Sequence, residues 1–307
     1  MGGYRRGVTG PLELPAAARA AILEWYGTHG RSLPFRATRD PYAILVSEAM
    51  AQQTQAARAG EAWTRFMAHF PTVEALAAAR PADVLRAWQG LGYNRRALAL
   101  WRAAQVIVNE HGGGVPSDVA ALEALPGVGP YTARAVAAIA FGLPVGAVDT
   151  NVRRVLGRIA LGDPGATSRQ EMQQLADSAV PRDRAGDWTH AVMDVGAVIC
   201  RPARPDCDAC PARTWCRYRT MVAEPVPRSS KPRRPTPAFP TTSRWLRGRI
   251  LDRLRAAPDA DWVELDGSVG SHEAEAVVVA ARALAREGLL ELEAAEAPVL
   301  RARLPVA

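Results

Sequence analysis

Apolar residues recur at three- and four-residue spacing along residues 14–225, and no stretch there alternates apolar and polar positions as a strand would. Helix-start signals accompany this spacing at Asp40 with Pro41, at Pro81 and at Ser117. The pattern therefore predicts an all-α domain built from successive helices with short loops.

The composition changes at residue 226, where a Pro-rich and basic segment, 226–242, predicts an extended linker. Beyond it, Ser243 and Ser271 are predicted to cap two helices, and Gly288 is predicted to end the second. The alternating stretches LLELE and VLRARLP then predict a terminal hairpin. We expect a small winged-helix-like module at 243–307. Two roles for it are equally compatible with the sequence: a packing appendage and a DNA-binding element.

The bulk composition is that of a globular protein, with 48% hydrophobic and 22% charged residues among 307. The net charge of +7 favours a polyanionic partner, although many basic proteins bind no nucleic acid. Lys231 is the only lysine, so nearly all the positive charge is arginine. No apolar run is long enough to span a membrane and no signal-peptide pattern opens the chain, so we expect a cytoplasmic protein.

All cysteines of the chain fall within one 17-residue stretch, 200–216. Such clustering indicates a metal or cluster site rather than disulfides between distant segments, and thiolates suit either a tetrahedral zinc or an iron–sulfur cluster. Arginines, among them Arg201 and Arg204, surround the stretch, so we expect this loop to face phosphate. The candidate ligands are Cys200, Cys207, Cys210 and Cys216.

The string LPGVGPYTA, at 125–133, predicts a tight turn between two helices. Gly127 and Gly129 would leave backbone N–H groups pointing outward at a helix N-terminus, where a phosphate can bind. Taken alone, a Gly-Val-Gly turn is more often a plain connection between helices.

Two carboxylates stand out for different reasons. Asp149, after the hairpin, is by itself an ordinary N-cap residue for the helix that follows. Glu48 has apolar residues such as Ile44 and Leu45 at helical spacing, so desolvation should favour its neutral form, as a general acid requires. The alternative for Glu48 is a place at the polar edge of a surface helix.

Together these strings resemble the MutY-type adenine DNA glycosylases, of the helix-hairpin-helix endonuclease III superfamily, over roughly residues 20–220. SEAMAQQTQ at 47–55 resembles a signature that endonuclease III lacks, and GLGYNRR at 90–96 resembles the family's GLGYY loop. The six-two-five cysteine spacing resembles the family's [4Fe-4S] loop. The resemblance implies a helix-hairpin-helix DNA glycosylase fold at 14–225 that includes a [4Fe-4S] loop at 200–216.

The resemblance also implies roles for individual residues. Glu48 would protonate the adenine ring, and Asp149, oriented by Asn151, would stabilise positive charge on the sugar. Tyr131 would line the base pocket, and it occupies the position where members with lyase activity carry a nucleophilic lysine, so we expect a monofunctional enzyme. The DNA-contacting residues would be Gln52, Gln53, Tyr93, Arg95, Gly127, Gly129, Arg201 and Arg204.

The chain departs from the family pattern in three places. Asn94 replaces the second aromatic residue of the GLGYY loop, and Thr150 stands where adenine glycosylases often have glycine. The tail is too short for the NUDIX-like domain that usually reads 8-oxoguanine, so the opposite-base preference stays open.

We therefore expect a monomeric enzyme that removes adenine mispaired with 8-oxoguanine or guanine from double-stranded DNA in base excision repair. It would be associated with the nucleoid in a bacterium. The alternatives are a thymine/uracil mismatch glycosylase and a non-catalytic DNA-binding protein that keeps this fold as a scaffold.

Overall fold

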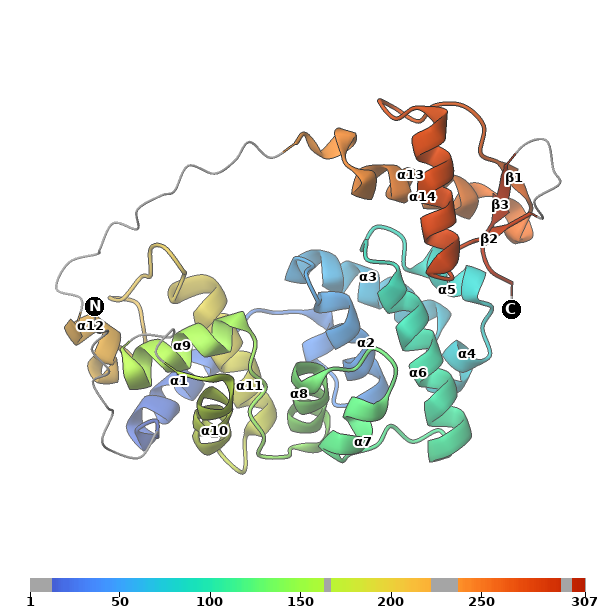
Figure 1. Cartoon of the computed structure of the whole chain (residues 1–307). Coiled ribbons are helices and arrows are strands. Elements are labelled where there is room, and N and C mark those ends of the chain that lie inside the picture. The colour runs from blue at the N-terminus through green and yellow to red at the C-terminus, as the bar shows by residue number, and fades with distance from the viewer. Residues whose placement is uncertain (1–12, 163–166, 222–236, 294–299, 307) are drawn as a thin grey trace. The chain divides into compact units, whose positions relative to one another are not determined.

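A computed structural model of the chain describes residues 13–162, 167–221, 237–293 and 300–306 (Figure 1). The chain forms two compact units, each assembled from segments that are far apart in sequence. The first unit comprises Met1–Glu48, Pro116–Ala124 and Val128–Arg228, and the second comprises Ala49–Val115, Leu125–Gly127 and Ser229–Ala307.

The described residues of the first unit form helices and loops and contain no strand. Its α-helices are α1 (Ala16–His29), α7 (Val119–Ala124), α8 (Pro130–Phe141), α9 (Thr150–Leu161), α10 (Arg169–Ala179), α11 (Ala185–Asp194) and α12 (Arg217–Met221). The 3-10 turns η1 (Pro34–Arg36) and η3 (Arg213–Trp215) complete it, together with η2 (Val195–Ile199), a π-helix that directly continues α11.

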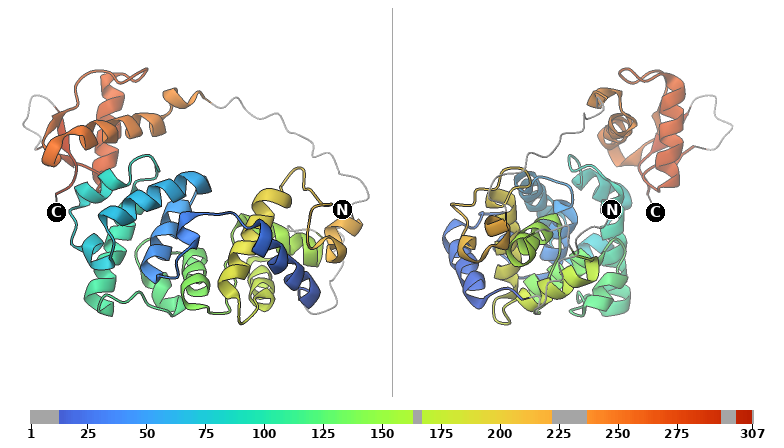
Figure 2. Two further views of the ribbon diagram at one scale, coloured as in Figure 1. Left: turned by 180° about the vertical axis from the view of Figure 1, so that it is seen from behind. Right: turned by 60° about the vertical axis from the view of Figure 1, so that its left-hand side comes forward.

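The core of the first unit lies where α1, α9, α10 and α11 pack together, and the views in Figures 1 and 2 agree on this grouping. Its largest buried side chains include Ile22, Leu156 and Met172. Helix α8 packs closely on α11, where a Cβ added to Gly186 would lie 3.2 Å from the Cα of Ile139.

The second unit contains the carboxyl end of α2 (Pro41–Ala51) and the helices α3 (Ala56–His69), α4 (Val73–Ala77), α5 (Pro81–Ala87) and α6 (Arg95–His111). Trp88, fully buried, meets the Phe66 ring edge-on with 6.0 Å between ring centroids. The helix starts predicted at Pro41 and Pro81 are confirmed; the first is assisted by Asp40, whose carboxylate accepts from the Tyr42 N–H at 3.1 Å.

The C-terminal module belongs to the second unit and contains α13 (Ser243–Ala256) and α14 (Ala274–Arg286), which pack on each other. The 3-10 turns η4 (Phe239–Thr241) and η5 (Pro258–Ala260) flank α13. Among the described residues, β1 (Val263–Glu264), β3 (Arg301–Arg303) and β2 (Glu291–Leu292) form an antiparallel sheet in that order. The predicted terminal hairpin is the β2–β3 pair, whereas β1 was not predicted because a two-residue strand has no periodicity to detect.

Three predicted caps are wrong by one or more residues. The cap of α13 is Thr242, whose hydroxyl accepts from the Trp245 N–H at 3.2 Å, and Ser243 is already the first helical residue. Asp118 rather than Ser117 accepts from the first N–H groups of α7. Helix α14 begins after Glu273 without a side-chain cap, so Ser271 lies outside it. At α13 and α14 the residue before the helix, Thr242 or Glu273, has the extended backbone of an N-cap position, which local sequence does not reveal. The end of α14 before Gly288, at φ +71°, is as predicted.

Backbone and side-chain contacts join the module to the helices of the second unit. The Arg255 guanidinium donates to the Leu85 carbonyl at 2.9 Å and to Asn94 Oδ1 at 2.7 Å. The Ala82 N–H donates to the Pro305 carbonyl at 3.0 Å.

Of the predicted linker 226–242, residues 226–236 lie outside the described residues, and the rest contains η4. In the part of the chain described, no helix combines the length and apolar character needed to cross a membrane.

Candidate active site and cysteine cavity

The hairpin between α7 and α8 is a turn that requires one of its two glycines. Gly127 has φ +77°, and a Cβ added there would lie 2.6 Å from the Cβ of Ala99, so a larger residue is excluded both by conformation and by space. Gly129 is the N-cap of α8 with φ −100°, and a Cβ there would meet no described atom within 4 Å. The turn therefore leaves the N-terminus of α8 open at Gly129, where a phosphate could approach the backbone.

Glu48 lies on α2 with only 8% of its surface exposed, beside the buried Ile44 and Leu45. Burial raises the pKa of its carboxyl to about 7, and the negative charge of Asp149 adds to this rise. A hydrogen bond from the Tyr131 hydroxyl and the charge of Arg36 act in the opposite direction. The predicted desolvation of Glu48 is thus confirmed, and near neutral pH a large fraction of this carboxyl carries a proton.

Asp149 is both a helix cap and a neighbour of Glu48. Its Oδ1 accepts from the Val152 N–H at 2.6 Å, which caps α9. Its Oδ2 accepts from Nδ2 of Asn151 at 2.9 Å. Burial raises the pKa of the Tyr131 hydroxyl, and the charges of Glu48 and Asp149 raise it further. The structure therefore brings all four predicted catalytic residues together within the first unit, and it satisfies the capping interpretation of Asp149 at the same time.

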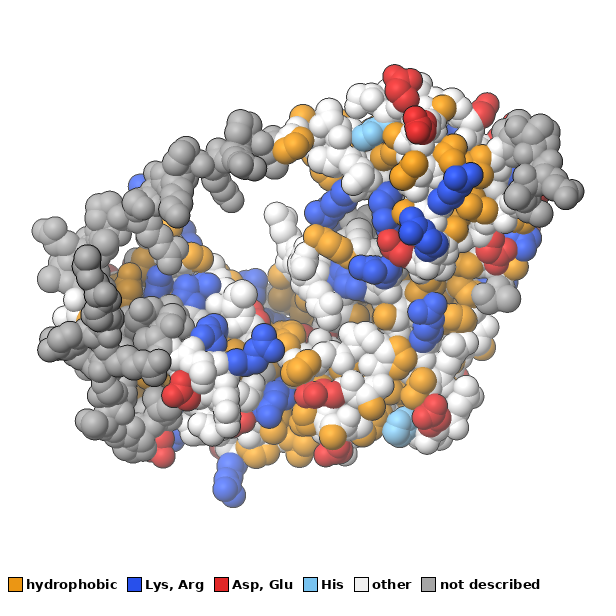
Figure 3. All heavy atoms as spheres, in the orientation of Figure 1, with side chains coloured by type: hydrophobic (Ala, Val, Ile, Leu, Met, Phe, Trp, Pro, Cys, Tyr) orange, Lys and Arg blue, Asp and Glu red, His pale blue; other side chains and the backbone are white. Residues whose placement is uncertain are grey.

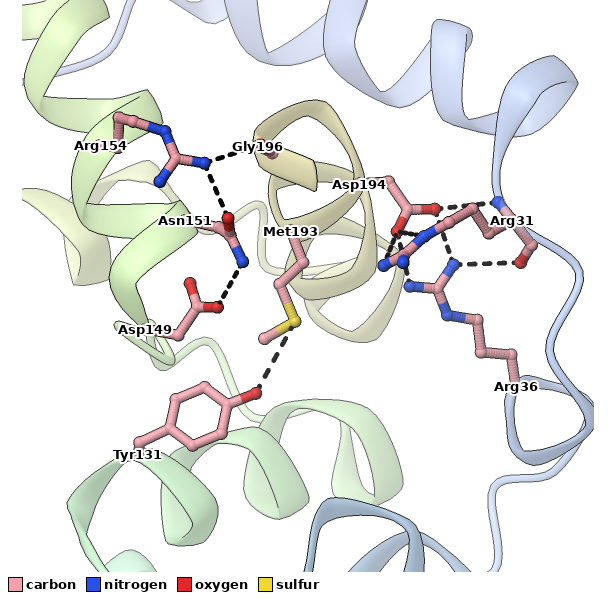
Figure 4. A network of polar contacts seen from close by, with 9 residues as sticks. All are labelled: Arg31, Arg36, Tyr131, Asp149, Asn151, Arg154, Met193, Asp194 and Gly196. Atoms are coloured by element: carbon pink, nitrogen blue, oxygen red, sulfur yellow. Dashed lines mark hydrogen bonds and ion pairs between the residues drawn. The ribbon is translucent and has the colours of Figure 1, made fainter. Parts of the chain in front are cut away.

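Asn151 is oriented by a second layer of contacts that the sequence did not indicate (Figure 4). Its Oδ1 accepts from the Arg154 guanidinium at 2.7 Å, and the same guanidinium donates to the carbonyls of Gly196 at 2.7 Å and Cys200 at 2.6 Å. Because the amide oxygen faces arginine, the amide NH₂ faces the Asp149 carboxylate.

The π-helix after α11 packs directly on this network. A Cβ added to Gly196 would lie 2.6 Å from the Cβ of Asn151, so only glycine lets the two backbones approach this closely. One turn earlier, Met193 Sδ lies 3.7 Å from the Tyr131 hydroxyl. A π-helix is rare and often occurs at functional sites. The sequence analysis did not single out Gly196, and a glycine inside an otherwise helical pattern is the one signal that could have indicated this packing.

A buried ion-pair cluster supports the same side of the site. Asp194 is fully buried and accepts from the Arg36 guanidinium at 2.7 and 2.8 Å, and from the Arg31 backbone N–H at 2.9 Å and its Nε at 2.7 Å. Burial acts to raise the pKa of Asp194, but the Arg36 and Arg31 contacts outweigh it and hold the pKa below its usual value. This cluster places the positive charge of Arg36 near Glu48. Asp194 was not predicted from the sequence.

The cysteines of the 200–216 loop line a single cavity in the first unit. Arg158, 4% exposed, donates to Cys200 Sγ at 3.3 Å and to the carbonyls of Arg201 and Pro202. Burial raises the pKa of Cys210 to about 11, and the neighbouring thiols add to this rise. The cavity is lined by Val155, Arg158, Ile159, Val195, Ile199, Cys200, Pro205, Asp206, Cys207, Cys210, Cys216, Tyr218 and Arg219.

Among the described residues, no three His, Cys, Asp or Glu side chains converge as ligands of one metal ion. The four thiols nevertheless surround the same space, carry no disulfide, and could ionise together only around a positively charged centre. The donor set therefore fits a thiolate-bound group. Arg201 and Arg204, the predicted phosphate contacts, are exposed on this loop.

The remaining predicted DNA contacts gather elsewhere. Gln52, Gln53, Tyr93 and Arg95 line one cavity in the second unit. Gln53 and Tyr93 have positive φ values, 54° and 45°, which are uncommon for residues other than glycine and cluster at functional sites.

Comparison with known proteins agrees with this fold. Residues 46–181 match the HhH-GPD superfamily of base excision DNA repair proteins. Among solved structures, a thermostable thymine-DNA glycosylase superposes with a TM-score of 0.63 at 32% identity, covering 66% of this chain and 95% of that one. The fold and the match define a base excision DNA repair protein of the helix-hairpin-helix class.

The curated relatives narrow the class. The adenine DNA glycosylase of Mycobacterium tuberculosis (strain H37Rv) is 44% identical over 254 residues, which is 81% of each chain. The human adenine DNA glycosylase is 42% identical over 220 residues, 68% of this chain and 40% of the human one. A thymine/uracil-DNA glycosylase of Methanothermobacter thermautotrophicus is 33% identical over 202 residues, 65% of this chain and 91% of that one. The chain belongs to the adenine DNA glycosylases of the HhH-GPD superfamily.

Proposed function

We propose that this enzyme excises adenine mispaired with 8-oxoguanine or guanine, by acid-assisted cleavage of the glycosidic bond. One observation carries the proposal: Glu48, buried and with a pKa of about 7, lies near Asp149, whose second oxygen is held by Asn151. A proton donor and a nearby ionised carboxylate are the two groups that cleavage of an N-glycosidic bond requires.

The geometry supports a division of labour between the carboxyls. A base inside the duplex cannot be reached, so the adenine is flipped out before reaction. Glu48 delivers its proton to the base and makes it a better leaving group. Asp149 stabilises the positive charge that develops on the sugar, and the Asn151 amide keeps its second oxygen in one orientation. Tyr131 donates a hydrogen bond to Glu48, and in this proposal it lines the pocket that receives the base.

We infer that strand cleavage is not part of the reaction. Lyase chemistry needs an amine nucleophile, whereas Tyr131 carries a phenol, and Lys231, the only lysine, lies outside the described residues. Water is then the nucleophile at the sugar.

We also propose that Cys200, Cys207, Cys210 and Cys216 hold a [4Fe-4S] cluster, with tetrahedral zinc as the alternative. Their common cavity and the single 17-residue loop support this assignment. When bound, the cluster would tie the exposed Arg-bearing loop together. In the same proposal the glycosylase domain spans 14–225, the linker 226–242, and a winged-helix-like module 243–307, in a monomeric enzyme that acts on double-stranded DNA.

A thymine/uracil mismatch activity is the second candidate, because one relative is described as a thymine/uracil-DNA glycosylase and one solved structure of similar fold as a thymine-DNA glycosylase. Single-turnover assays on duplexes with A:8-oxoG, A:G, T:G and U:G distinguish the two. We expect release of adenine alone, without strand breaks until base or an AP endonuclease is added. Faster release of thymine or uracil than of adenine would replace the proposed substrate, and no release from any duplex would favour a non-catalytic DNA-binding protein.

A further inference from the structure

The C-terminal module forms one side of a cavity of about 790 Å³ in the second unit. The other side comes from the helical part of the same unit, namely Gln52, Gln53, Arg58 and the loop 90–96. The module contributes Phe239, residues of α13 between Ser243 and Arg255, and the carboxyl end of α14 with Glu287 and Leu289.

The lining of this cavity is strongly basic. Seven arginines contribute to it, against two acidic residues, Asp252 and Glu287. Figure 3 shows arginine side chains gathered over α13 and the carboxyl end of α14. The arginines are Arg58, Arg95, Arg96, Arg244, Arg247, Arg249 and Arg255.

Four of these arginines already have structural partners. Arg96 and Arg255 are tied to backbone carbonyls, Arg247 is paired with Glu287, and Arg249 is paired with Asp252. The paired acidic groups thus leave a surplus of positive charge in the cavity.

The surplus positive charge of the cavity lies on Arg58, Arg95 and Arg244. Arg95 is 3.7 Å from Glu287, already bound by Arg247, and its side chain is 74% exposed. In the described part of the chain neither Arg58 nor Arg244 forms an ion pair with a carboxylate. Arg244, from the first turn of α13, instead lies over the Tyr93 ring at 4.5 Å from its centroid.

The neighbouring loops are held in strained conformations beside these arginines. Gln53 and Tyr93 both have positive φ. The half-buried Arg96 guanidinium donates to the carbonyls of Ala49 at 2.8 Å, Gln52 at 2.6 Å and Gly92 at 3.3 Å, so one side chain anchors both loops. Backbone strain of this kind persists only where the surrounding structure enforces it.

We propose that the module is a DNA-binding element, and that Arg244, Arg58 and Arg95 bind the phosphodiester backbone of duplex DNA. Guanidinium groups suit phosphate geometry, and a cavity of this size with several separate arginines fits a run of phosphates better than one small anion. This inference rests on the proposed function for its substrate, and it assigns the C-terminal module a part in binding rather than in packing alone.

The test measures DNA affinity of the full-length protein against salt concentration, with a matched duplex and with an A:8-oxoG duplex. Glu48→Gln serves as the background so that the second duplex stays intact. We expect Arg58→Ala and Arg244→Ala each to make the negative slope of log K against log salt shallower by about one unit, with weaker binding to both duplexes. Arg244→Lys keeps the charge and should restore the slope.

Arg253→Ala is the matched control, because Arg253 lies on the same helix, pairs with Asp266 at 3.5 Å and does not line the cavity. Its slope should match that of the background. The proposal is overturned if Arg58→Ala and Arg244→Ala leave the slope unchanged, or if Arg253→Ala changes it equally. It is also overturned if only the A:8-oxoG affinity falls at constant slope, since the cavity would then bind a base. Failure of the proposed function appears separately, as absence of adenine release by the unmutated enzyme.

Discussion

The side-chain amide of Asn151 donates to Asp149 Oδ2 at 2.9 Å, while the other carboxylate oxygen accepts from the backbone N–H of Val152. Both oxygens of the proposed electrostatic catalyst are therefore occupied by donors that keep the carboxylate in one orientation. Its negative charge is available without any rearrangement, which is how a preorganised site stabilises a cationic transition state.

Replacing Asp149 by asparagine separates its two roles. Asparagine caps helices as well as aspartate does, so the free energy of unfolding should change by less than about 1 kcal/mol. The charge is lost, and single-turnover adenine release should fall by at least about a hundredfold. Chemical denaturation and adenine release measured on the same preparation check both parts. A folded Asp149→Asn protein with near-normal excision would leave Asp149 as a cap only.

The rate of adenine release should depend on the protonation of Glu48. Because burial raises the pKa of this group to about 7, the acid form predominates below that pH and disappears above it. The single-turnover rate should be highest below about pH 7 and then fall about tenfold per pH unit. Glu48→Gln should be slower by at least about a hundredfold and lose this dependence. A wild-type rate that stays constant from pH 7 to 9 would remove Glu48 as the proton donor.

The same buried carboxyl should cost stability at alkaline pH. Its pKa is about 7 in the folded protein and near 4.5 when unfolded, so the folded state binds more protons between these values, and stability falls as pH rises through them. The difference corresponds to about 3 kcal/mol at most. The free energy of unfolding of Glu48→Gln, measured by urea denaturation, should therefore rise relative to that of the wild type when the pH is raised from 5 to 8.5.

Glu61→Gln, at an exposed position of α3, controls for the loss of one carboxyl. If the two variants show the same difference between pH 5 and 8.5, burial of Glu48 is not the cause.

Gly196→Ala should displace Asn151, the residue that holds the Asp149 carboxylate. The new methyl group would lie 2.6 Å from the Asn151 Cβ, so α9 or the π-helix must shift. We expect a loss of about 1–3 kcal/mol of stability, typical of overpacking, and slower adenine release. Gly27→Ala is the matched control in helix α1, where a Cβ meets no described atom within 4 Å and alanine should stabilise by up to about 1 kcal/mol. Equal thermal shifts in the two variants would contradict tight packing at Gly196.

Anaerobically purified protein should contain about four irons and matching sulfide per chain, with broad visible absorbance. Cys210→Ser should lose this absorbance, because Cys210 lines the common cavity with the other thiols. Zinc without iron or sulfide in the wild-type protein would replace the cluster by a tetrahedral zinc site.

Local sequence determined the features of this protein that depend on a few neighbouring residues. The helical spacing around Glu48 indicated a desolvated carboxyl, and burial of that side chain confirms it. The turn at Gly127 was predictable because a positive φ favours glycine. The β2–β3 hairpin was predictable because its strands alternate apolar and polar residues. Caps were less predictable: Thr242 and Ser243 are adjacent hydroxyl residues, and only the backbone path decides which one caps α13.

Only the tertiary structure decided which distant residues meet. Arg154, which donates to Asn151, reaches the Gly196 carbonyl across 42 residues of chain, and Asp194 reaches Arg36 across 158. No periodicity within α9 or α11 signals these contacts, because they depend on how two helices pack. The basic cavity beside Tyr93 is likewise formed by segments about 150 residues apart, so its surplus of arginine charge becomes apparent only when the chain has folded.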